Sequence, residues 1–369
     1  MPTLVNVLDS LTADGELVEM LPEEAVRCLA CAHRCLIRKG RRGICQVRFN
    51  RDGHLRVPWG YVSGLQADPI EKKPFFHVLP GEIALTFGML GCDFHCGYCQ
   101  NWLTSQVLRD PAADESIYYI RKVTPEQVAE TARRVDAAVV VSSYNEPLIT
   151  SEWAVAIFKQ VKADGRKCAY VSNGNATPEV LEYLRPYLDA YKIDLKSMQD
   201  KNYRRLGGVL KNVQDTIQRA RQMGLWVEVV TLVVPGFNDS TEELWDTARF
   251  LAGVSADIPW HVTAFHKDYR MTGADNTPAR TLLRAAEIGR EAGLRYVYAG
   301  NLPGRVDEYE NTTCHHCNAT LVQRHGYVIS GYHISPDGKC PKCGREVAGI
   351  WAEKPQGTKL EGAGMPWRI

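Results

Sequence analysis

Short apolar runs alternate with helical patterns along the middle of the chain. The apolar runs have the length of β-strands and lie at residues 83–87, 137–143, 167–172, 190–195, 226–234, 260–265 and 296–299. Between them, apolar residues recur with the helical period at residues 125–135, 152–163, 179–187, 213–223, 242–251 and 279–292. Several of these helices begin near a proline or end near a glycine. Repeated strand and helix units predict an α/β fold with a parallel sheet of about seven strands.

The two flanks of this repeat have a different pattern. Residues 4–11 form one short amphipathic stretch, and residues 47–81 contain short apolar runs broken by Gly and Pro, which is typical of hairpins. Near the C-terminus, strand-like runs at residues 320–322 and 327–329 flank Gly326. The pattern therefore predicts three domains: an N-terminal extension over residues 1–81, an α/β domain over 82–308 and a C-terminal tail over 309–369.

Composition and charge exclude some classes of partner. The 369 residues are 45% hydrophobic, which is enough for a sizeable core. Lys and Arg number 44 against 43 Asp and Glu, so no overall basic field favours nucleic acid as a partner. The first 26 residues lack the pattern of a signal peptide, and no apolar run approaches the roughly 18 residues that a membrane helix needs. We expect a cytoplasmic protein with neither a nucleic-acid nor a membrane partner.

Cysteine is frequent, and its spacing adds candidate chemistry. Of 12 cysteines, all except Cys168 fall into three groups. The groups are Cys28, Cys31, Cys35 and Cys45; Cys92, Cys96 and Cys99; and Cys314, Cys317, Cys340 and Cys343. In a cytoplasmic chain of this size such groups indicate metal binding rather than disulfides. Cys168 lies alone in a strand-like run and is expected to be a buried apolar residue.

The two four-cysteine groups predict accessory metal sites. The N-terminal group, with Gly40 and Gly43 supplying turns, suits either a closed zinc site or a fully ligated Fe-S cluster, since thiolates serve both. The C-terminal group forms two Cys-x2-Cys knuckles separated by 22 residues. Four thiolates fill a tetrahedral site, so the tail is predicted to hold a structural metal, zinc rather than iron. His315 and His316 are expected to lie outside the metal shell.

The central group is the candidate reaction centre. Cys92, Cys96 and Cys99 have the spacing Cys-x3-Cys-x2-Cys and directly follow the strand-like run at residues 83–87. Three thiolates on one short loop suit a [4Fe-4S] cluster. Three also leave one iron without a protein ligand, so that an outside molecule can bind there, as at the open position of a catalytic zinc site.

Several motifs together resemble one known family. Besides the three cysteines and the aromatic Tyr98, they are Cys28-Leu29-Ala30-Cys31-Ala32-His33-Arg34-Cys35, Asp68-Pro69-Ile70-Glu71-Lys72-Lys73-Pro74, Cys99-Gln100-Asn101-Trp102 and Tyr144-Asn145-Glu146-Pro147. They resemble radical S-adenosylmethionine (SAM) enzymes, the branch with pyruvate formate-lyase activating enzymes, and within it the AmmeMemoRadiSam system radical SAM enzyme. The resemblance implies a partial (β/α)6 barrel with a Cys-rich N-terminal extension and a small zinc-ribbon or rubredoxin-like tail. It places the Asp68 to Pro74 motif near the active-site mouth.

Polar residues at the ends of successive strands are candidates for SAM binding, because ligands of such sheets bind at the carboxyl ends of the strands. SAM needs an acceptor for its ammonium, a cation for its carboxylate and an acceptor for its ribose; Glu146, Lys196 and Asp194 can supply these. Asn145 and Asn173 lie at the same strand ends. By family position, Tyr98, Val233, His261 and His266 resemble the adenine surroundings, with a structural role open for both histidines. Where related activases have Gly-Gly-Glu-Pro, this chain has Tyr144-Asn145-Glu146-Pro147, which leaves the geometry of that turn open.

The resemblance implies that the enzyme reductively cleaves SAM to a 5'-deoxyadenosyl radical, which abstracts hydrogen from a substrate. It also implies a one-electron donor of the flavodoxin or ferredoxin type. The AmmeMemoRadiSam reading adds Memo-like and AMMECR-like companion proteins and a substrate that the sequence does not name. An activase that takes hydrogen from a glycine of a partner protein is the alternative enzyme. A non-enzymatic zinc protein that binds partners is the remote alternative.

Overall fold

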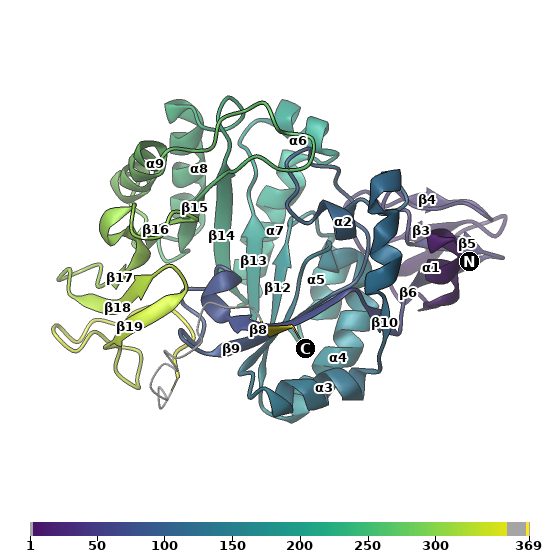
Figure 1. Cartoon of the computed structure of the whole chain (residues 1–369), viewed down its shortest axis with the longest axis horizontal. Helices are drawn as coiled ribbons and strands as arrows, with labels where there is room; N and C mark the ends of the chain where they lie inside the picture. The colour runs from purple at the N-terminus through teal and green to yellow at the C-terminus, as the bar shows by residue number, and fades with distance from the viewer. Residues whose placement is uncertain (1–2, 353–366, 369) are drawn as a thin grey trace.

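The computed structural model describes residues 3–352 and 367–368, and within them a nine-stranded sheet forms the centre of the molecule (Figure 1). The strand order is β16-β15-β14-β13-β12-β11-β9-β8-β20. Strands β9 and β11 to β16 pair in parallel, while β8 is antiparallel to β9 and β20 is antiparallel to β8. The strands are β8 (Gly64–Pro69), β9 (Ile83–Gly88), β11 (Val139–Ser142), β12 (Lys167–Ser172), β13 (Ala190–Asp194), β14 (Trp226–Val233), β15 (Trp260–Ala264), β16 (Val297–Gly300) and β20 (Trp367–Arg368). The predicted parallel α/β sheet is confirmed.

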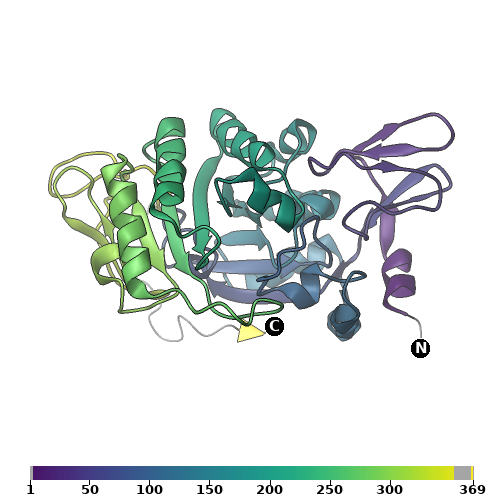
Figure 2. The same cartoon turned by 90° about the horizontal axis from the view of Figure 1, so that it is seen from above.

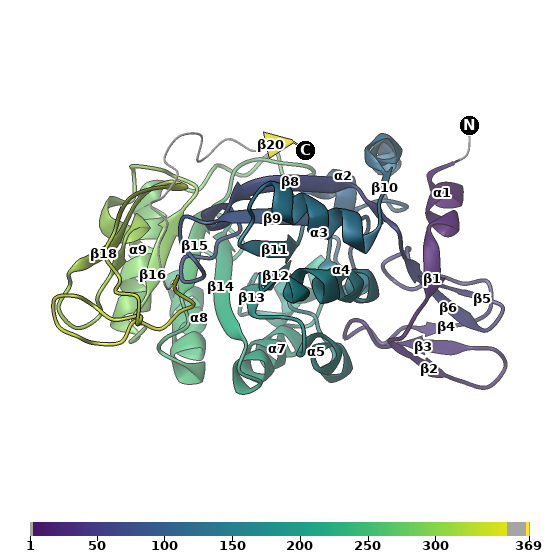
Figure 3. The same ribbon diagram turned by 90° about the horizontal axis from the view of Figure 1, so that it is seen from below.

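The helices between the parallel strands begin where the sequence supplies capping side chains. Thr124 accepts from the backbone N–H of Gln127 in a capping box, and Thr177 and Ser240 cap the starts of two later helices in a similar way. The helices lie along the outer face of the sheet (Figure 3). They are α3 (Pro125–Arg134), α4 (Ser151–Ala163), α5 (Pro178–Leu184), α6 (Asp200–Leu206), α7 (Leu210–Gln222), α8 (Thr241–Val254) and α9 (Ala279–Glu291). Of these, the sequence pattern did not predict α6, which is short and mostly polar.

The sheet is buried on both faces, as a parallel sheet must be. Its outer face packs on the helices. On its inner face, Ala84, Val139 and Val141 pack with Ile70 and Phe75, which belong to the connection between β8 and β9. Because β16 and β20 end the strand order and do not pair with each other, the sheet is open on one side. This architecture is the partial barrel that the sequence led us to expect.

Residues 64–69 correct one expectation. The sequence pattern placed them in a hairpin-rich segment ahead of the barrel, but they form β8, which extends the main sheet antiparallel to β9. The short elements around the barrel are β7 (Tyr61–Val62), η1 (Ile70–Lys72), α2 (Trp102–Ser105), η2 (Pro111–Tyr119), β10 (Arg121–Lys122), η3 (Pro147–Thr150) and η4 (Asp307–Glu310). No helix among the described residues is long and apolar enough to cross a membrane.

The N-terminal extension lies at one end of the molecule (Figures 1 and 2). It contains α1 (Leu4–Ser10) and two small antiparallel sheets. One sheet is β1 (Thr12–Asp14), β6 (His54–Pro58) and β5 (Phe49–Arg51); the other is β2 (Val18–Met20), β3 (Val26–Cys28) and β4 (Leu36–Ile37). A buried ion pair attaches the extension to the barrel. The Arg48 guanidinium donates to both carboxylate oxygens of Glu152 in α4, at 2.7 and 2.8 Å.

We expect Arg48→Met to lower the free energy of unfolding by about 3 to 5 kcal/mol, because it leaves the buried Glu152 carboxylate without its partner. Denaturant unfolding of the metal-loaded protein measures this. The double variant R48M/E152L should recover part of the loss, since no buried charge is then unpaired.

The exposed pair of Arg204 and Asp200, 2.9 Å apart, provides the control. Arg204→Met should cost no more than about 1 kcal/mol. A cost for Arg48→Met as small as that of the control would contradict this account.

The C-terminal tail lies beside β16, at the opposite end from the extension (Figure 1). Its sheet has the order β17 (Thr312–Thr313), β18 (Thr320–His325) and β19 (Val328–Tyr332). Buried Arg324 anchors the tail, donating to the carbonyl of Phe76 at 2.9 Å and to the hydroxyl of Thr312 at 2.7 Å. The ring nitrogen Nδ1 of His77 lies 2.6 Å from the carbonyl oxygen of Ala348. The tail is therefore packed against the segment that fills the inside of the barrel.

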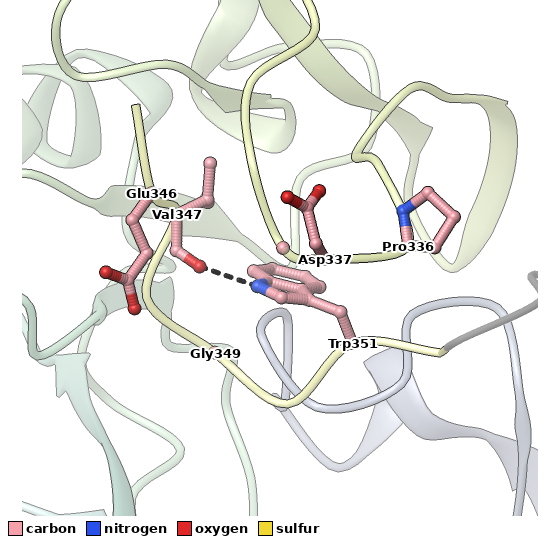
Figure 4. A pocket seen from close by; sticks show the side chains of 7 residues that line it. Pro336, Asp337, Glu346, Val347, Gly349 and Trp351 are labelled. Carbon is pink, nitrogen blue, oxygen red and sulfur yellow. Dashed lines mark hydrogen bonds between the residues drawn. The ribbon is translucent and has the colours of Figure 1, made fainter. Parts of the chain in front are cut away.

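Trp351 lies near the last described residues of the tail before the gap at 353–366 and contacts other tail residues. The indole N–H of Trp351 donates to the carbonyl of Val347 at 2.6 Å. Figure 4 shows the pocket of about 270 Å³ that this ring lines together with Pro336, Asp337 and Glu346. All of its lining residues belong to the tail. The pocket is thus a feature of tail packing rather than part of the barrel.

Candidate active site

The loop with Cys92, Cys96 and Cys99 directly follows β9, at the carboxyl end of the parallel strands. Cys96 is buried, and the other two thiols are partly buried. The backbone N–H of Phe94 donates to Cys92 Sγ at 3.3 Å, and Cys99 Sγ lies 3.2 Å from the hydroxyl of Ser105. Burial raises the pKa of Cys96 to about 12, against the opposing charge of Lys196. The surroundings of Cys92, Cys96 and Cys99 thus favour the neutral thiol over the thiolate. Metal binding would supply the positive charge that stabilises the thiolates.

Close packing holds this loop in place. Gly91, at its start, has φ +101°, and a Cβ there would lie 2.8 Å from Cγ2 of Val47 in the N-terminal extension. Phe94 fills the space beside Gly208, where a Cβ would lie 2.4 Å from its ring. Both glycines are thus required by close approach, and at Gly91 also by a backbone conformation that other residues rarely adopt. The loop is fixed between the extension and the segment after α6.

Glu146 lies beside the loop and is 3% exposed. Its carboxylate accepts from the backbone N–H groups of Leu148 and Asn173, at 3.0 and 2.8 Å, and from the hydroxyl of Ser172 at 2.7 Å. A carboxylate has about four acceptor positions, so one remains for a further donor. Burial, followed by the charge of Asp93, raises the pKa of Glu146 to about 8. A cation that binds here would therefore stabilise the ionised form.

The turn that carries Glu146 adopts the geometry that the sequence left open. Tyr144 has φ +70°, the left-handed conformation that a glycine would favour. Its hydroxyl contacts Lys73 at 3.0 Å, and the Lys73 ammonium lies 4.7 Å from the centre of its ring. Asn145 completes the turn, accepting from the N–H of Met89 and donating to the carbonyl of Glu146. Tyrosine is accommodated because contacts with the Asp68 to Pro74 segment hold it.

Asp194 and Lys196 form a charged group at the end of β13. The Lys196 ammonium donates to Asp194 at 3.0 Å, and the ammonium of Lys192 donates to its other oxygen. Burial opposes ionisation, but the two lysines outweigh it and lower the pKa of Asp194 to about 2. Burial likewise opposes charge on Lys196, yet Asp194 and Cys96 raise its pKa. Lys196 therefore stays cationic within electrostatic reach of the cysteine loop.

The candidate adenine residues lie in different places. Tyr98 is buried edge-on against Phe237, with ring centres 5.8 Å apart. Val233 is the last residue of β14, and its carbonyl accepts from Thr277 at 2.6 Å. His266 lies beyond β15, with Nε2 2.8 Å from the side-chain nitrogen of Gln100, the residue after Cys99. The cysteine loop thus contacts the segment after β14 through Tyr98 and the segment after β15 through Gln100.

His261 is placed differently. It is the second residue of β15, toward the amino end of the strand, and its Nε2 lies 2.7 Å from the carboxylate of Glu228. Its ring also packs against Phe76 and Tyr298. Among the contacts of the described residues, these link His261 to the interior packing and the tail. These contacts therefore favour a structural role for His261 over contact with adenine.

Asp93 is a buried residue of the site that the sequence analysis did not single out. Its two carboxylate oxygens accept from the side-chain amides of Asn173 and Asn175, at 2.7 and 2.8 Å. The ring nitrogen Nε2 of His33 lies 3.8 Å from the same carboxylate. Asp93 follows Cys92 directly, so an acidic residue inside the three-cysteine motif was the only signal in the sequence. It connects the N-terminal extension to the strand ends.

The two accessory cysteine groups differ in compactness. In the tail, Cys314 and Cys343 have sulfurs 3.6 Å apart, and those of Cys317 and Cys340 are 3.7 Å apart. All four sulfurs lie within 4.8 Å of one another, as a single tetrahedral ion requires. The tail thus fits a metal-binding unit. The N-terminal cysteines converge within the extension but do not form such a group in the described part of the chain.

Comparison with known proteins agrees with this site. The model of the Radical SAM superfamily matches residues 87–251. The chain belongs to the radical SAM superfamily of enzymes. Over its length it is similar to Uncharacterized protein MJ0808 of Methanocaldococcus jannaschii, with 36% identity over 334 residues, 89% of this chain and 97% of that protein.

Two further comparisons concern activating enzymes. The isethionate sulfite-lyase activating enzyme of Oleidesulfovibrio alaskensis is 28% identical over 130 residues, 33% of this chain and 41% of that enzyme. Among solved structures, a domain of the pyruvate-formate lyase-activating enzyme from Bacteroides vulgatus matches with a TM-score of 0.39 and 18% identity, covering 44% of this chain and 98% of that domain. The sequence relatives thus include one activating enzyme, which matches a third of this chain.

Superfamily membership implies a [4Fe-4S] cluster and SAM, and the residues present fit both. The three thiols share one loop, and they are not among the described groups whose ligand atoms all lie within 4.8 Å of one another. A cluster does not need that closeness, because it attaches each thiolate to a different iron. Beside the thiols lie the buried carboxylate of Glu146, with one free acceptor position, and the partly buried ammonium of Lys196. These are the charges that complement the ammonium and carboxylate of SAM.

Proposed function

We propose that this chain is a radical SAM enzyme of the AmmeMemoRadiSam type, which abstracts hydrogen from a substrate with the help of Memo-like and AMMECR-like companion proteins. The observation that carries the proposal is the three-cysteine loop at the carboxyl end of β9, with Glu146 and Lys196 beside it. The motifs of the extension and the two four-cysteine groups favour this type over a simpler activase. The three proposed parts are residues 1–81, 82–308 and 309–369.

Each part of the site has a proposed role. When bound, the cluster and SAM supply a 5'-deoxyadenosyl radical that abstracts a hydrogen atom, after one electron has arrived from a donor protein. Cys92, Cys96 and Cys99 hold the cluster.

Glu146 accepts from the SAM ammonium at its remaining acceptor position, and Lys196 pairs with the SAM carboxylate. Asp194 accepts from the ribose hydroxyls, and Asn145 and Asn173 are further polar residues of the SAM site. Tyr98, Val233 and His266 border the adenine.

A glycyl-radical activase is the second candidate, favoured by the similarity to the isethionate sulfite-lyase activating enzyme. In that case the substrate is a glycine in a partner protein. Both candidate enzymes first cleave SAM reductively. They differ in the molecule from which hydrogen is then abstracted.

Anaerobic reconstitution with iron, sulfide, SAM and a reductant tests the proposal. Formation of 5'-deoxyadenosine supports both enzyme candidates, and its absence from fully reconstituted protein would overturn both. Addition of the two companion proteins should increase its formation if the AmmeMemoRadiSam proposal holds. A glycyl radical signal on a partner protein in electron paramagnetic resonance would instead select the activase.

We propose that the tail holds zinc as a structural metal, and Cys343→Ser tests this in the full chain. The variant should lose about one zinc per chain and unfold at a lower temperature, because a structural zinc contributes folding energy. Elemental analysis and thermal unfolding measure the two effects. Ser335→Ala, on a neighbouring exposed turn of the tail, is the control and should keep its zinc. Iron in place of zinc in the wild-type tail would reassign the metal.

A further inference from the structure

The N-terminal cysteines Cys28, Cys31, Cys35 and Cys45 form one site whose metal the proposed function leaves open. Three of the four thiols are buried, and Cys35 is partly exposed. The backbone N–H of Cys28 donates to the carbonyl of Cys35 at 3.0 Å. Near Cys35, the backbone N–H of Ile44 donates to the sulfur at 3.4 Å. The segments that carry Cys28, Cys35 and Cys45 are therefore held side by side.

Their spacing separates two kinds of metal centre. A single zinc with Zn–S bonds of about 2.3 Å holds its four sulfurs about 3.8 Å apart. The tail cysteines meet this requirement, with sulfur pairs at 3.6 and 3.7 Å. In a [4Fe-4S] cube each thiolate is attached to a different iron, so the sulfurs lie farther apart.

The same chain thus contains an internal comparison. Among the described residues, the tail cysteines are the one group of metal-ligating side chains whose atoms all lie within 4.8 Å of one another. The cysteines of the radical SAM loop, which suit a [4Fe-4S] cluster, do not form such a closely spaced group. The N-terminal cysteines do not form one either. By spacing, the N-terminal site therefore resembles the cluster loop and differs from the tail.

A buried N–H group near these thiols lacks a hydrogen-bond acceptor among the described residues. Arg48 is 1% exposed, and its Nε has no hydrogen-bond partner in the structure although both Nη atoms are bonded. Arg48 follows Cys45 by three residues, and its carbonyl accepts from the backbone N–H of Gly43, in the same loop, at 2.9 Å. The sulfides and thiolates of a cluster would accept from the Nε–H of Arg48 and offset its desolvation.

The N-terminal cysteine loops lie directly against the radical SAM loop. Arg109 donates from one nitrogen to the carbonyl of Phe94 at 2.7 Å and from the other to the carbonyl of Ile44, next to Cys45. On the other side, the backbone N–H of Ala32 donates to the carbonyl of Asn175 at 2.8 Å. The side chain of Asn175 in turn donates to Asp93, next to Cys92.

We infer that Cys28, Cys31, Cys35 and Cys45 hold a second [4Fe-4S] cluster, ligated at every iron, next to the radical SAM loop. Four thiolates leave no iron open for SAM, so this site differs in chemistry from the central one. The inference does not depend on the identity of the substrate.

The test uses the full chain with the central site removed, so that the N-terminal site itself is unaltered. The variant C92S/C96S/C99S is reconstituted anaerobically with iron and sulfide and analysed for iron, sulfide and zinc. We expect about four iron and four sulfide per chain, and a cluster signal in electron paramagnetic resonance after reduction. Adding Cys35→Ser, the most exposed ligand, should reduce the iron and sulfide further, whereas adding Cys168→Ser should leave both unchanged. Circular dichroism checks that each variant is folded.

Two results would overturn the inference. One is an N-terminal site with about one zinc per chain and no sulfide. The other is iron without sulfide, which indicates a single ion. Neither outcome affects the proposed function, because 5'-deoxyadenosine formation by the wild-type protein measures the central site separately. Conversely, a cluster in the triple variant together with no 5'-deoxyadenosine from the wild type would keep this inference and refute the proposed function.

Discussion

Replacement of any one of Cys92, Cys96 and Cys99 by alanine is expected to abolish reductive cleavage of SAM. Two thiolates on this loop should not hold a cluster that keeps one iron open. The structure adds a second reason, because the loop is packed closely against Val47 and the segment after α6 and contains no fourth cysteine. The measurement is 5'-deoxyadenosine formed by anaerobically reconstituted protein, which should fall to background.

Cys168→Ala is the matched control. Cys168 is also a buried cysteine, but it lies in β12 away from the three metal-binding groups. This variant should form 5'-deoxyadenosine at nearly the wild-type rate and lose only a little stability from the smaller side chain. Wild-type product from any of the three loop variants would refute the assignment of the reaction centre.

Glu146→Ala should weaken SAM binding by roughly ten- to a hundredfold, since a buried charge-assisted hydrogen bond contributes about 1.5 to 3 kcal/mol. Cluster assembly should persist, because Glu146 is not a cluster ligand. The structure also predicts a loss of stability, because the backbone N–H groups of Leu148 and Asn173 lose their buried acceptor. Calorimetry with SAM measures affinity, and thermal unfolding measures stability.

Glu146→Gln separates these two roles. Glutamine keeps one oxygen acceptor and nearly the same shape, but it lacks the negative charge that an ammonium needs. It should therefore lose SAM affinity with a smaller loss of stability than alanine. Glu130→Gln, on the exposed side of α3, makes the same chemical change away from the site and should alter neither quantity. If Glu146→Gln binds SAM like the wild type, Glu146 has a purely structural role.

The strands and helices of the barrel could be predicted from sequence because their patterns depend on residues that are close together in the chain. Each parallel strand of the sheet is largely buried on both faces and so appears as a mostly apolar run, and the helices have their own period, several with a cap, as at Thr124. The predicted strands and helices of residues 83–300 agree with the structure except at their ends. The short helix α6 was missed because its polar sequence has no clear apolar stripe.

Interactions between distant segments could not be predicted in this way. Asp93 meets Asn173, Asn175 and His33 only because separate loops converge at the strand ends. His261 lies toward the amino end of β15 and pairs with Glu228 of the neighbouring strand, a fact that depends on the register of β14 and β15. Tyr144 adopts a left-handed backbone because Lys73 and its neighbours hold its ring.

By itself, therefore, the sequence determined the strand and helix order of the barrel and the three cysteine groups, since both are properties of neighbouring residues along the chain. Tertiary structure alone decided which charges surround the cysteine loop and how far apart the thiols of each group lie. The tail sulfurs come within single-ion distance because two knuckles meet across a small sheet. The N-terminal sulfurs do not, although both groups contain four cysteines, because spacing along a chain does not fix distance across a fold.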